Sequence, residues 1–105
     1  MGEHYLLALA TTLAIEVPVV AAAFFRTWWR MAIACAAATT CTHLAMHFVV
    51  RPLAGSHLVF IVVGEVMATV VEGVVYALVS RPRDLPRAFL ASALANSLSF
   101  GFGLL

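Results

Sequence analysis

Apolar residues dominate the chain in four long windows that are separated by short polar breaks. The windows cover roughly residues 5–25, 31–50, 57–79 and 86–105. A helix needs ~20 predominantly apolar residues to cross the ~30 Å hydrocarbon layer of a bilayer, and each window has about that length. The breaks contain arginine, proline, glycine and serine, which are typical of turns. The pattern therefore predicts an all-α protein, a bundle of four antiparallel transmembrane helices.

Composition supports a polytopic membrane protein. Of the 105 residues, 64% are hydrophobic and 10% are charged, whereas soluble domains carry about 25% charged residues. The mean hydropathy of the chain is +1.04. The windows use nearly the whole length, so we expect one transmembrane domain over residues 1–105 and no soluble domain. An outer-membrane barrel is excluded, because the windows lack strict alternation and a barrel needs about eight strands or more.

The basic residues predict the orientation in the membrane. All six are arginines, and five of them lie around the first and third breaks. Cytoplasmic loops carry an excess of basic residues. We therefore expect loops 26–30 and 80–87 to face the cytoplasm of a cell and both termini to lie outside. Trp28 and Trp29 would then lie in the cytoplasmic aromatic belt.

Polar side chains recur along one face of each expected helix. The clearest set is in the third window, where the spacing i, i+4, i+7, i+11 predicts one helix face: Glu65, Thr69, Glu72 and Tyr76. The other windows carry shorter sets: Thr12 and Glu16 in the first, Thr39, His43 and His47 in the second, and Ser92, Asn96, Ser99 and Gly103 in the fourth. Four helices of this kind imply a shared polar interior.

Four polar residues are expected at the same depth. Counted from the nearest arginine of the cytoplasmic loops, each lies nine or ten residues into its helix. At 1.5 Å per residue this is ~14 Å, close to the middle of the bilayer. The four residues are Glu16, Thr39, Glu72 and Asn96. We therefore expect them to meet near the midplane.

The two halves of the chain are similar in a way that suggests an internal duplication. The segment "RMAIACAAATTCTH" (30–43) aligns without a gap on "RAFLASALANSLSF" (87–100), an offset of 57 residues, and Glu16 aligns on Glu72 at an offset of 56. Two duplicated helical hairpins of the same orientation would be related by a pseudo-two-fold axis along the membrane normal. Much of the identity is alanine in an alanine-rich chain, so chance similarity stays an alternative.

Carboxyl groups inside a bilayer are candidates for function. A charged carboxylate near the bilayer centre costs ~2.5–3.5 kcal/mol on the insertion scale, and burial favours the neutral form. A glutamic acid that is neutral at rest and ionises when a cation or water arrives suits proton-coupled transport. The alternative is structural, with neutral glutamic acids holding helices together at ~0.6–2 kcal/mol per hydrogen bond. The candidate polar residues are Glu16, Thr39, Glu65, Glu72, Tyr76 and Asn96.

Two histidines suggest a second kind of chemistry. His43 and His47, in "THLAMH", have the i, i+4 spacing that lets two imidazoles reach one metal ion. Both are expected in the outer half of the membrane, as is Glu65, so a metal site of these three residues is geometrically plausible. Two further interpretations are open: neutral, hydrogen-bonded histidines, and a proton relay that titrates near pH ~6.5.

The short loops, the size and Glu16 within "AIEVPVV" resemble the small multidrug resistance transporters. Those proteins are dimers in which the glutamate of the first helix takes either a proton or a substrate. That family has no second and third membrane glutamate and no HxxxH pair. The resemblance therefore extends neither to membership nor to substrates.

Three classes of function follow from these patterns. The first is a proton- or cation-linked transporter or channel module that acts as an oligomer, with Glu65 and the two histidines as its outer path. The second is a structural or accessory subunit of a larger membrane complex, and the third is a metal-binding membrane protein. We expect no enzyme, because no motif of nucleophilic spacing appears. We also expect no cofactor and no nucleic-acid partner; the expected partners are the lipid bilayer and copies of the chain or other membrane subunits.

Overall fold

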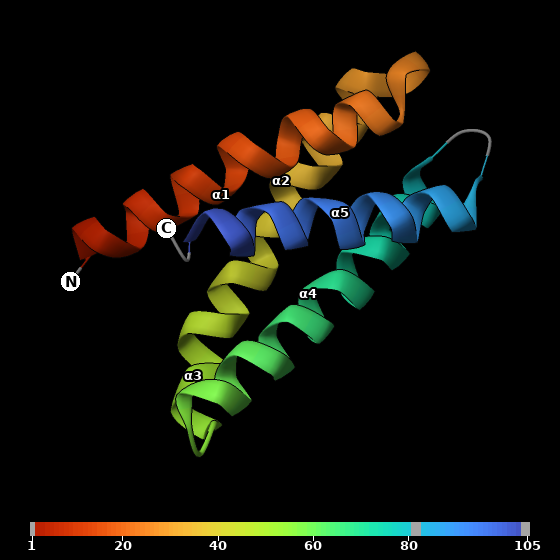
Figure 1. Cartoon of the computed structure of the whole chain (residues 1–105). Helices are drawn as coiled ribbons and strands as arrows, with labels where there is room; N and C mark the ends of the chain where they lie inside the picture. The colour runs from red at the N-terminus through yellow and green to blue at the C-terminus, as the bar shows by residue number, and fades with distance from the viewer. Residues whose placement is uncertain (1, 81–82, 104–105) are drawn as a thin grey trace.

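The computed structural model describes residues 2–80 and 83–103, with side chains for residues 5–80 and 83–102. Within these ranges the chain is all-helical and contains no strand, which confirms the all-α prediction. The elements in chain order are α1 (Gly2–Ala23), η1 (Phe25–Thr27), α2 (Trp28–Ala45), η2 (Met46–Val50), α3 (Arg51–Leu53), α4 (His57–Val79) and α5 (Leu85–Gly103) (Figure 1).

The four long helices of the described chain form a ring in which each contacts two neighbours. Helix α1 packs on α2 and α5, and α4 packs on the same two helices from the other side. The molecule measures 40 × 23 × 21 Å along its principal axes. Because the ring has an inside, a polar face on any of the four helices can turn toward the other three.

Three helical segments of the described chain are long and apolar enough to cross a membrane: Tyr5–Ala23, Phe25–Leu53 and His57–Val79. The fourth predicted span, 86–105, corresponds to α5, which is not among them. Helix α5 is long enough, but it contains Arg87, an asparagine and three serines, which lower its apolar character. A fourth span therefore stays a prediction.

The second span is longer than predicted and contains a wide helical turn. Helicity continues from Trp28 to Leu53, so the predicted break at 51–56 shrinks to Ala54–Ser56. Pro52 has no N–H, and its ring crowds the carbonyl four residues earlier. The turn before it, Met46–Val50, is a π-helix, and the Arg51 N–H donates to the carbonyl of Met46, five residues back. A π turn is a known way to accommodate such a local disturbance.

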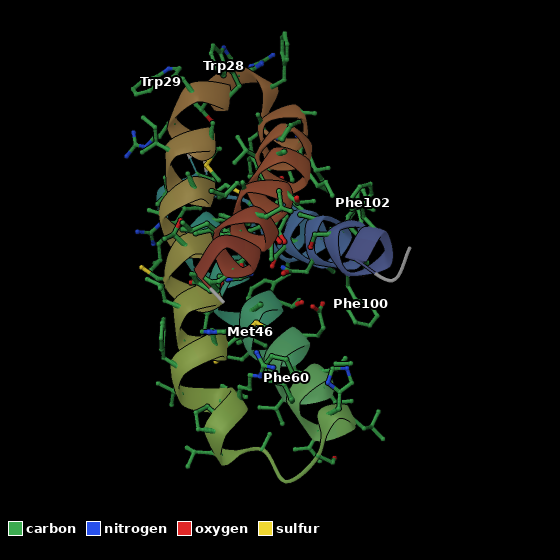
Figure 2. All side chains as sticks on the ribbon, turned by 90° about the vertical axis from the view of Figure 1, so that its left-hand side faces the viewer. Trp28, Trp29, Met46, Phe60, Phe100 and Phe102 are labelled. Carbon is green, nitrogen blue, oxygen red and sulfur yellow. The ribbon has the colours of Figure 1, made fainter. Side chains whose placement is uncertain are left out.

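Two arms diverge from the end of the molecule that carries the α1–α2 and α4–α5 turns (Figure 1). We call the first the loop arm, residues 43–65, which holds the end of α2, η2, α3 and the start of α4. We call the second the terminal arm, residues 2–12 and 99–103, which holds the start of α1 and the end of α5. Figure 2 shows the same separation, with α1 and α5 pointing toward the viewer and the loop arm running downward.

Small residues set the approach of α4 and α5. Ala88, Ala91 and Ala95 on α5 are 0–3% exposed, which lets the two helices pack closely. On α4, a Cβ atom added to Gly73 would collide with the ring of Phe89. This tight contact fixes the rotation of α4 against α5, and with it the direction of the polar face of α4.

An arginine joins the second hairpin to the end of the first. Arg87, at the start of α5, donates from Nη1 to the carbonyl oxygen of Ala23 at 3.0 Å, which caps the last turn of α1. The Asp84 carboxylate caps the start of α5 by accepting from the Arg87 N–H at 3.1 Å. The two turns are therefore held side by side.

Candidate functional site

Glu72 lies inside the ring, where its carboxyl group is surrounded by hydrogen-bond donors. Its side chain is 1% exposed. Oε2 accepts from the Thr42 hydroxyl at 2.8 Å, and Oε1 lies 3.3 Å from the Tyr76 hydroxyl, 3.3 Å from Asn96 Nδ2 and 3.5 Å from the Thr39 hydroxyl. The donors come from α2, α4 and α5, so the carboxyl group of Glu72 links three helices.

Glu16, on α1, completes the ring. It is also 1% exposed, and α1 is helical through Pro18, two residues later. Its Oε2 accepts from the Ser99 hydroxyl at 2.6 Å, and its Oε1 lies 3.2 Å from the Thr39 hydroxyl. The predicted midplane residues are therefore brought together, and the Thr39 hydroxyl lies between the two carboxyl groups.

The Thr39 hydroxyl has one proton and two carboxyl neighbours. It can donate to one carboxylate at a time. The contact with the other carboxyl group is a hydrogen bond only when that group carries a proton and donates to the threonine oxygen. This arrangement is fully bonded when Glu16 and Glu72 hold one proton between them.

Neither carboxyl group has a basic partner among the described residues. The salt bridge observed within these residues joins Arg87 Nε and Asp84 Oδ2, which lie 3.2 Å apart near the surface and outside this site. A buried carboxylate without a counter-charge is strongly disfavoured. The pair of Glu16 and Glu72 therefore needs protons, a cation or water to balance its charge.

A cavity of about 120 Å³ adjoins the two carboxyl groups. It has room for several water molecules, and its wall supplies enough polar partners to hold them. Its lining residues come from all four long helices and from η2: Thr12, Glu16, Thr39, Thr42, His43, Met46, Glu65, Ala68, Glu72, Asn96, Ser99 and Phe100. In Figure 2 the side chain of Phe100 projects from α5 toward the loop arm, on which Met46 is labelled.

Glu65 and His43 line this cavity from the loop arm, whereas His47 does not. The His47 ring packs on Tyr5, with centroids 4.6 Å apart, and the His43 ring lies 5.2 Å from the same tyrosine. Among the described residues no group of three histidine, cysteine or acidic side chains is arranged to hold a metal ion. The three-residue metal site of His43, His47 and Glu65 is therefore not formed, and a two-histidine site stays a prediction.

Two members of the predicted α4 face, Thr69 and Tyr76, do not line the cavity. Ala68 lines it one position before Thr69, and the Thr69 carbonyl accepts from the Ser92 hydroxyl at 2.8 Å. Glu65, Glu72 and Tyr76 do face the interior. The inward face of α4 therefore follows the spacing i, i+3, i+7, i+11, with Ala68 at the place where the i+4 spacing predicted Thr69.

Thr42 and Ser99 are the partners of the carboxyl groups that the sequence did not single out as site residues. Each follows a predicted site residue by three positions, which is one helical turn, since Thr42 follows Thr39 and Ser99 follows Asn96. The predicted polar face of the second helix included His43, four positions after Thr39, and left out Thr42. The internal alignment would have found them, because it pairs Thr42 with Ser99.

Four hydrogen bonds of the two carboxyl groups form matched pairs at positions that the two halves of the sequence align. They are Thr39 to Glu16 and Asn96 to Glu72 within the hairpins, and Ser99 to Glu16 and Thr42 to Glu72 between them. The further bonds of Glu72, from Thr39 and Tyr76, belong to neither pair. Each hairpin thus contributes a carboxyl group and also donors for the carboxyl group of the other.

Comparison of the chain with protein-family models, curated proteins and solved structures finds no match. The class of protein is therefore defined by the features above. It is an all-helical protein with three helical segments long and apolar enough to cross a membrane. Its interior holds two buried carboxyl groups beside a small cavity that polar and apolar side chains line together.

Proposed function

We propose that the protein is a proton- or cation-linked transporter or channel module, and that Glu16 and Glu72 take up and release the transported ion. The observation that carries this proposal is the carboxyl pair itself. Two carboxyl groups share the Thr39 hydroxyl, are 1% exposed and lack a basic partner among the described residues. Buried carboxyl groups of this kind are the usual sites of proton and cation exchange in membrane proteins.

The hydroxyls of Thr42 and Ser99 suit a carboxyl group that changes its charge. Besides the carboxyl contact, each hydroxyl lies 3.1 Å from the backbone carbonyl three residues earlier on its own helix. A charged carboxylate accepts a hydrogen bond from the hydroxyl group. A protonated carboxyl group donates to the hydroxyl oxygen, whose own proton then turns to the backbone carbonyl. Both states are satisfied without helix movement, whereas a buried unsatisfied group costs about 1–3 kcal/mol.

The duplication of a helical hairpin forms part of this proposal. Its support is that the four matched hydrogen bonds fall on aligned positions, as do two further pairs in the cavity wall. The further pairs are Thr12 with Ala68 and His43 with Phe100. Matched bonds at aligned positions favour duplication over random similarity between alanine-rich helices. We infer two half-sites related by a pseudo-two-fold axis along the membrane normal.

A four-span topology follows from the same inference. If α5 is equivalent to α2, it crosses the membrane with its serines and asparagine turned toward the cavity. The turns with five of the six arginines would then face the cytoplasm of a cell membrane, and both termini would lie outside. Because the cavity beside the carboxyl groups has a volume of only about 120 Å³ in one copy, we expect assembly into an oligomer or with other membrane subunits.

An accessory subunit of a larger membrane complex is the second candidate. One observation favours it: the bonds of the two carboxyl groups join α1, α2, α4 and α5, which is what an association role requires. Interhelical hydrogen bonds in membranes contribute about 0.6–2 kcal/mol each. In that case the carboxyl groups would stay protonated, and the protein alone would move no ion.

Reconstitution separates the two candidates. The purified protein is placed in liposomes that contain a pH-sensitive dye, and proton flux is measured with and without Na⁺ or K⁺ gradients. We expect flux in the wild type and its loss in Glu16→Gln and Glu72→Gln. Asp84→Asn removes a carboxyl group outside the site and should leave flux unchanged. A silent wild type that co-purifies in equal amounts with another membrane protein would instead support the accessory subunit.

A further inference from the structure

The cavity extends from the two carboxyl groups in one direction only. We call the end of the ring that carries the α1–α2 and α4–α5 turns the turn end, and the two arms extend away from it (Figure 1). On each long helix one lining residue is the nearest to the turn end, and these are Glu16, Thr39, Glu72 and Asn96. Every other lining residue lies farther from the turns, in the direction of the arms. The cavity therefore reaches toward the arms and not toward the turn end.

The exposure of the lining residues changes in the same direction. The lining residues outside the two arms, which include both glutamates, are buried. Those of the arms are half-buried: Thr12, Ser99 and Phe100 from the terminal arm, and His43, Met46 and Glu65 from the loop arm. Each arm thus adds two polar side chains to the wall. The cavity opens between the arms, through a mouth that both arms make polar.

Apolar packing closes the turn end. Between the carboxyl groups and the turns lies a buried cluster whose larger members we call the seal: Val20, Phe24, Met31, Cys35 and Tyr76. They are 0–7% exposed, and buried alanines of α4 and α5 belong to the same cluster. A water molecule in a cavity needs about two to four polar partners. The Tyr76 hydroxyl already donates to Glu72, and a thiol is only a weak donor, so the seal is dry.

Each long helix shows the same contrast at equal distances from its site residue. Positions four residues apart lie on the same face of a helix. Four residues toward the arms from the four site residues, every position lines the cavity: Thr12, His43, Ala68 and Phe100. Four residues toward the turns, every position is 0% exposed and none lines it: Val20, Cys35, Tyr76 and Ser92. The difference therefore depends on depth and not on which face of a helix turns inward.

We propose that both carboxyl groups are reached from the side of the arms alone, and that the seal must part before an ion can leave at the turn end. The access part concerns only where water meets the site. The release part rests on the proposed function, and it selects a carrier over an open channel, because the seal leaves no continuous water path through the ring. In the predicted orientation the arms face the outside.

Cysteine labelling tests the access part with pairs at equal distances from one site residue. Every protein carries one cysteine in a background of Cys35→Ala and Cys41→Ala, except that Cys41→Ala alone leaves the native Cys35. Thr12→Cys is compared with Val20→Cys, His43→Cys with the native Cys35, and Phe100→Cys with Ser92→Cys. Detergent-solubilised protein is used, so that a charged thiol reagent meets both ends of the molecule.

The cysteine nearer the arms should react at least about tenfold faster in each pair, because the reagent attacks water-exposed thiolates. Labelling of the denatured proteins corrects for differences in thiol reactivity, and size-exclusion profiles identify variants that fail to fold. Equal rates within the pairs would overturn one-sided access. Slow labelling of both members would also overturn it, because the mouth would then not be wet.

The native Cys35 tests the release part in liposomes. Cys41→Ala protein transports protons while the reagent is present on both sides of the membrane. If the seal parts at each turnover, Cys35 reacts slowly and flux falls in step with the labelled fraction, whereas the Cys35→Ala, Cys41→Ala protein keeps its starting flux. Undiminished flux with unlabelled Cys35 would overturn the release part. A wild type that moves no ion but labels faster near the arms would refute the proposed transport and leave one-sided access standing.

Discussion

Ser99 on α5 donates a 2.6 Å hydrogen bond to Glu16 on α1, 83 residues away in the sequence. The corresponding bond of the other half, from Thr42 to Glu72, measures 2.8 Å. Both bonds cross from one hairpin to the other. Neither carboxyl group is therefore satisfied within its own hairpin, and the site exists only when the two hairpins are packed together.

Removal of either crossing hydroxyl should destabilise the fold to a similar extent. Ser99→Ala and Thr42→Ala each leave a buried carboxyl group with one partner fewer, which costs about 1–3 kcal/mol. Thermal unfolding in detergent measures the loss. Ser97 is exposed, so Ser97→Ala is the control and should change stability by less than about 0.5 kcal/mol. An equal loss of stability in Ser97→Ala would show that the two crossing bonds do not stabilise the fold more than an exposed serine does.

Loss of the Thr39 hydroxyl should reduce proton flux more than loss of the Thr40 hydroxyl. Thr39→Val keeps the shape and removes the donor shared by the two carboxyl groups, so we expect proton flux to fall by about tenfold or more. Thr39→Asn should retain most of the flux, because asparagine is the residue that donates at the aligned position 96. The Thr40 hydroxyl donates to the carbonyl of Ala36 at 2.7 Å, so flux in Thr40→Val should equal that of the wild type. Equal flux in the two valine variants would contradict the shared bond.

The two carboxyl groups should be energetically coupled. A double-mutant cycle of Glu16→Gln and Glu72→Gln measures this, with the free energy of unfolding as the readout. Because both groups compete for the Thr39 hydroxyl, we expect a coupling energy of about 0.5–3 kcal/mol. Effects that add to within about 0.3–0.5 kcal/mol would mean that the groups act independently.

Packing of α4 on α5 should tolerate no side chain at Gly73. Gly73→Ala places a methyl group against the Phe89 ring, and overpacking of this kind costs about 1–3 kcal/mol. Phe89→Ala in the same chain should recover part of the loss. Gly101→Ala is the matched control in α5, where an added Cβ meets no atom within 4 Å. The midpoints of thermal unfolding rank the stabilities of these variants. A Gly73→Ala variant as stable as Gly101→Ala would contradict the close contact between Gly73 and Phe89.

The elements could be predicted from local pattern, because each depends on the chain nearby. Long apolar windows interrupted by proline, glycine and arginine produce helices at nearly the predicted places. The observed end of the second helical segment differs from the predicted end, because Pro52 changes the preceding turn in a way that hydrophobic periodicity does not indicate. Before Pro52 the helix widens into a π turn instead of ending, so the second helical segment runs to Leu53.

The partners within the site could be predicted only in part. Depth from the arginine turns grouped four residues that the structure also brings together, Glu16, Glu72, Thr39 and Asn96, since rise per residue is nearly constant along a helix. The rotation of each helix about its own axis is not fixed by the rise per residue. Ala68 lines the cavity where Thr69 was expected, and Thr42 lines it whereas His47 does not, because contacts with neighbouring helices decide which positions turn inward.

The sequence by itself determined the apolar surroundings of the acidic residues and their distance along each helix from the arginine-containing turns, since hydropathy and helix rise are local properties. Only the tertiary structure decided that Ser99 meets Glu16 and that Thr42 meets Glu72. It also decided that Glu65 shares a cavity wall with His43 without a third metal ligand among the described residues. Which side chains meet across a ring of helices depends on how small residues such as Gly73 let the helices approach and rotate, and that is a property of pairs of helices.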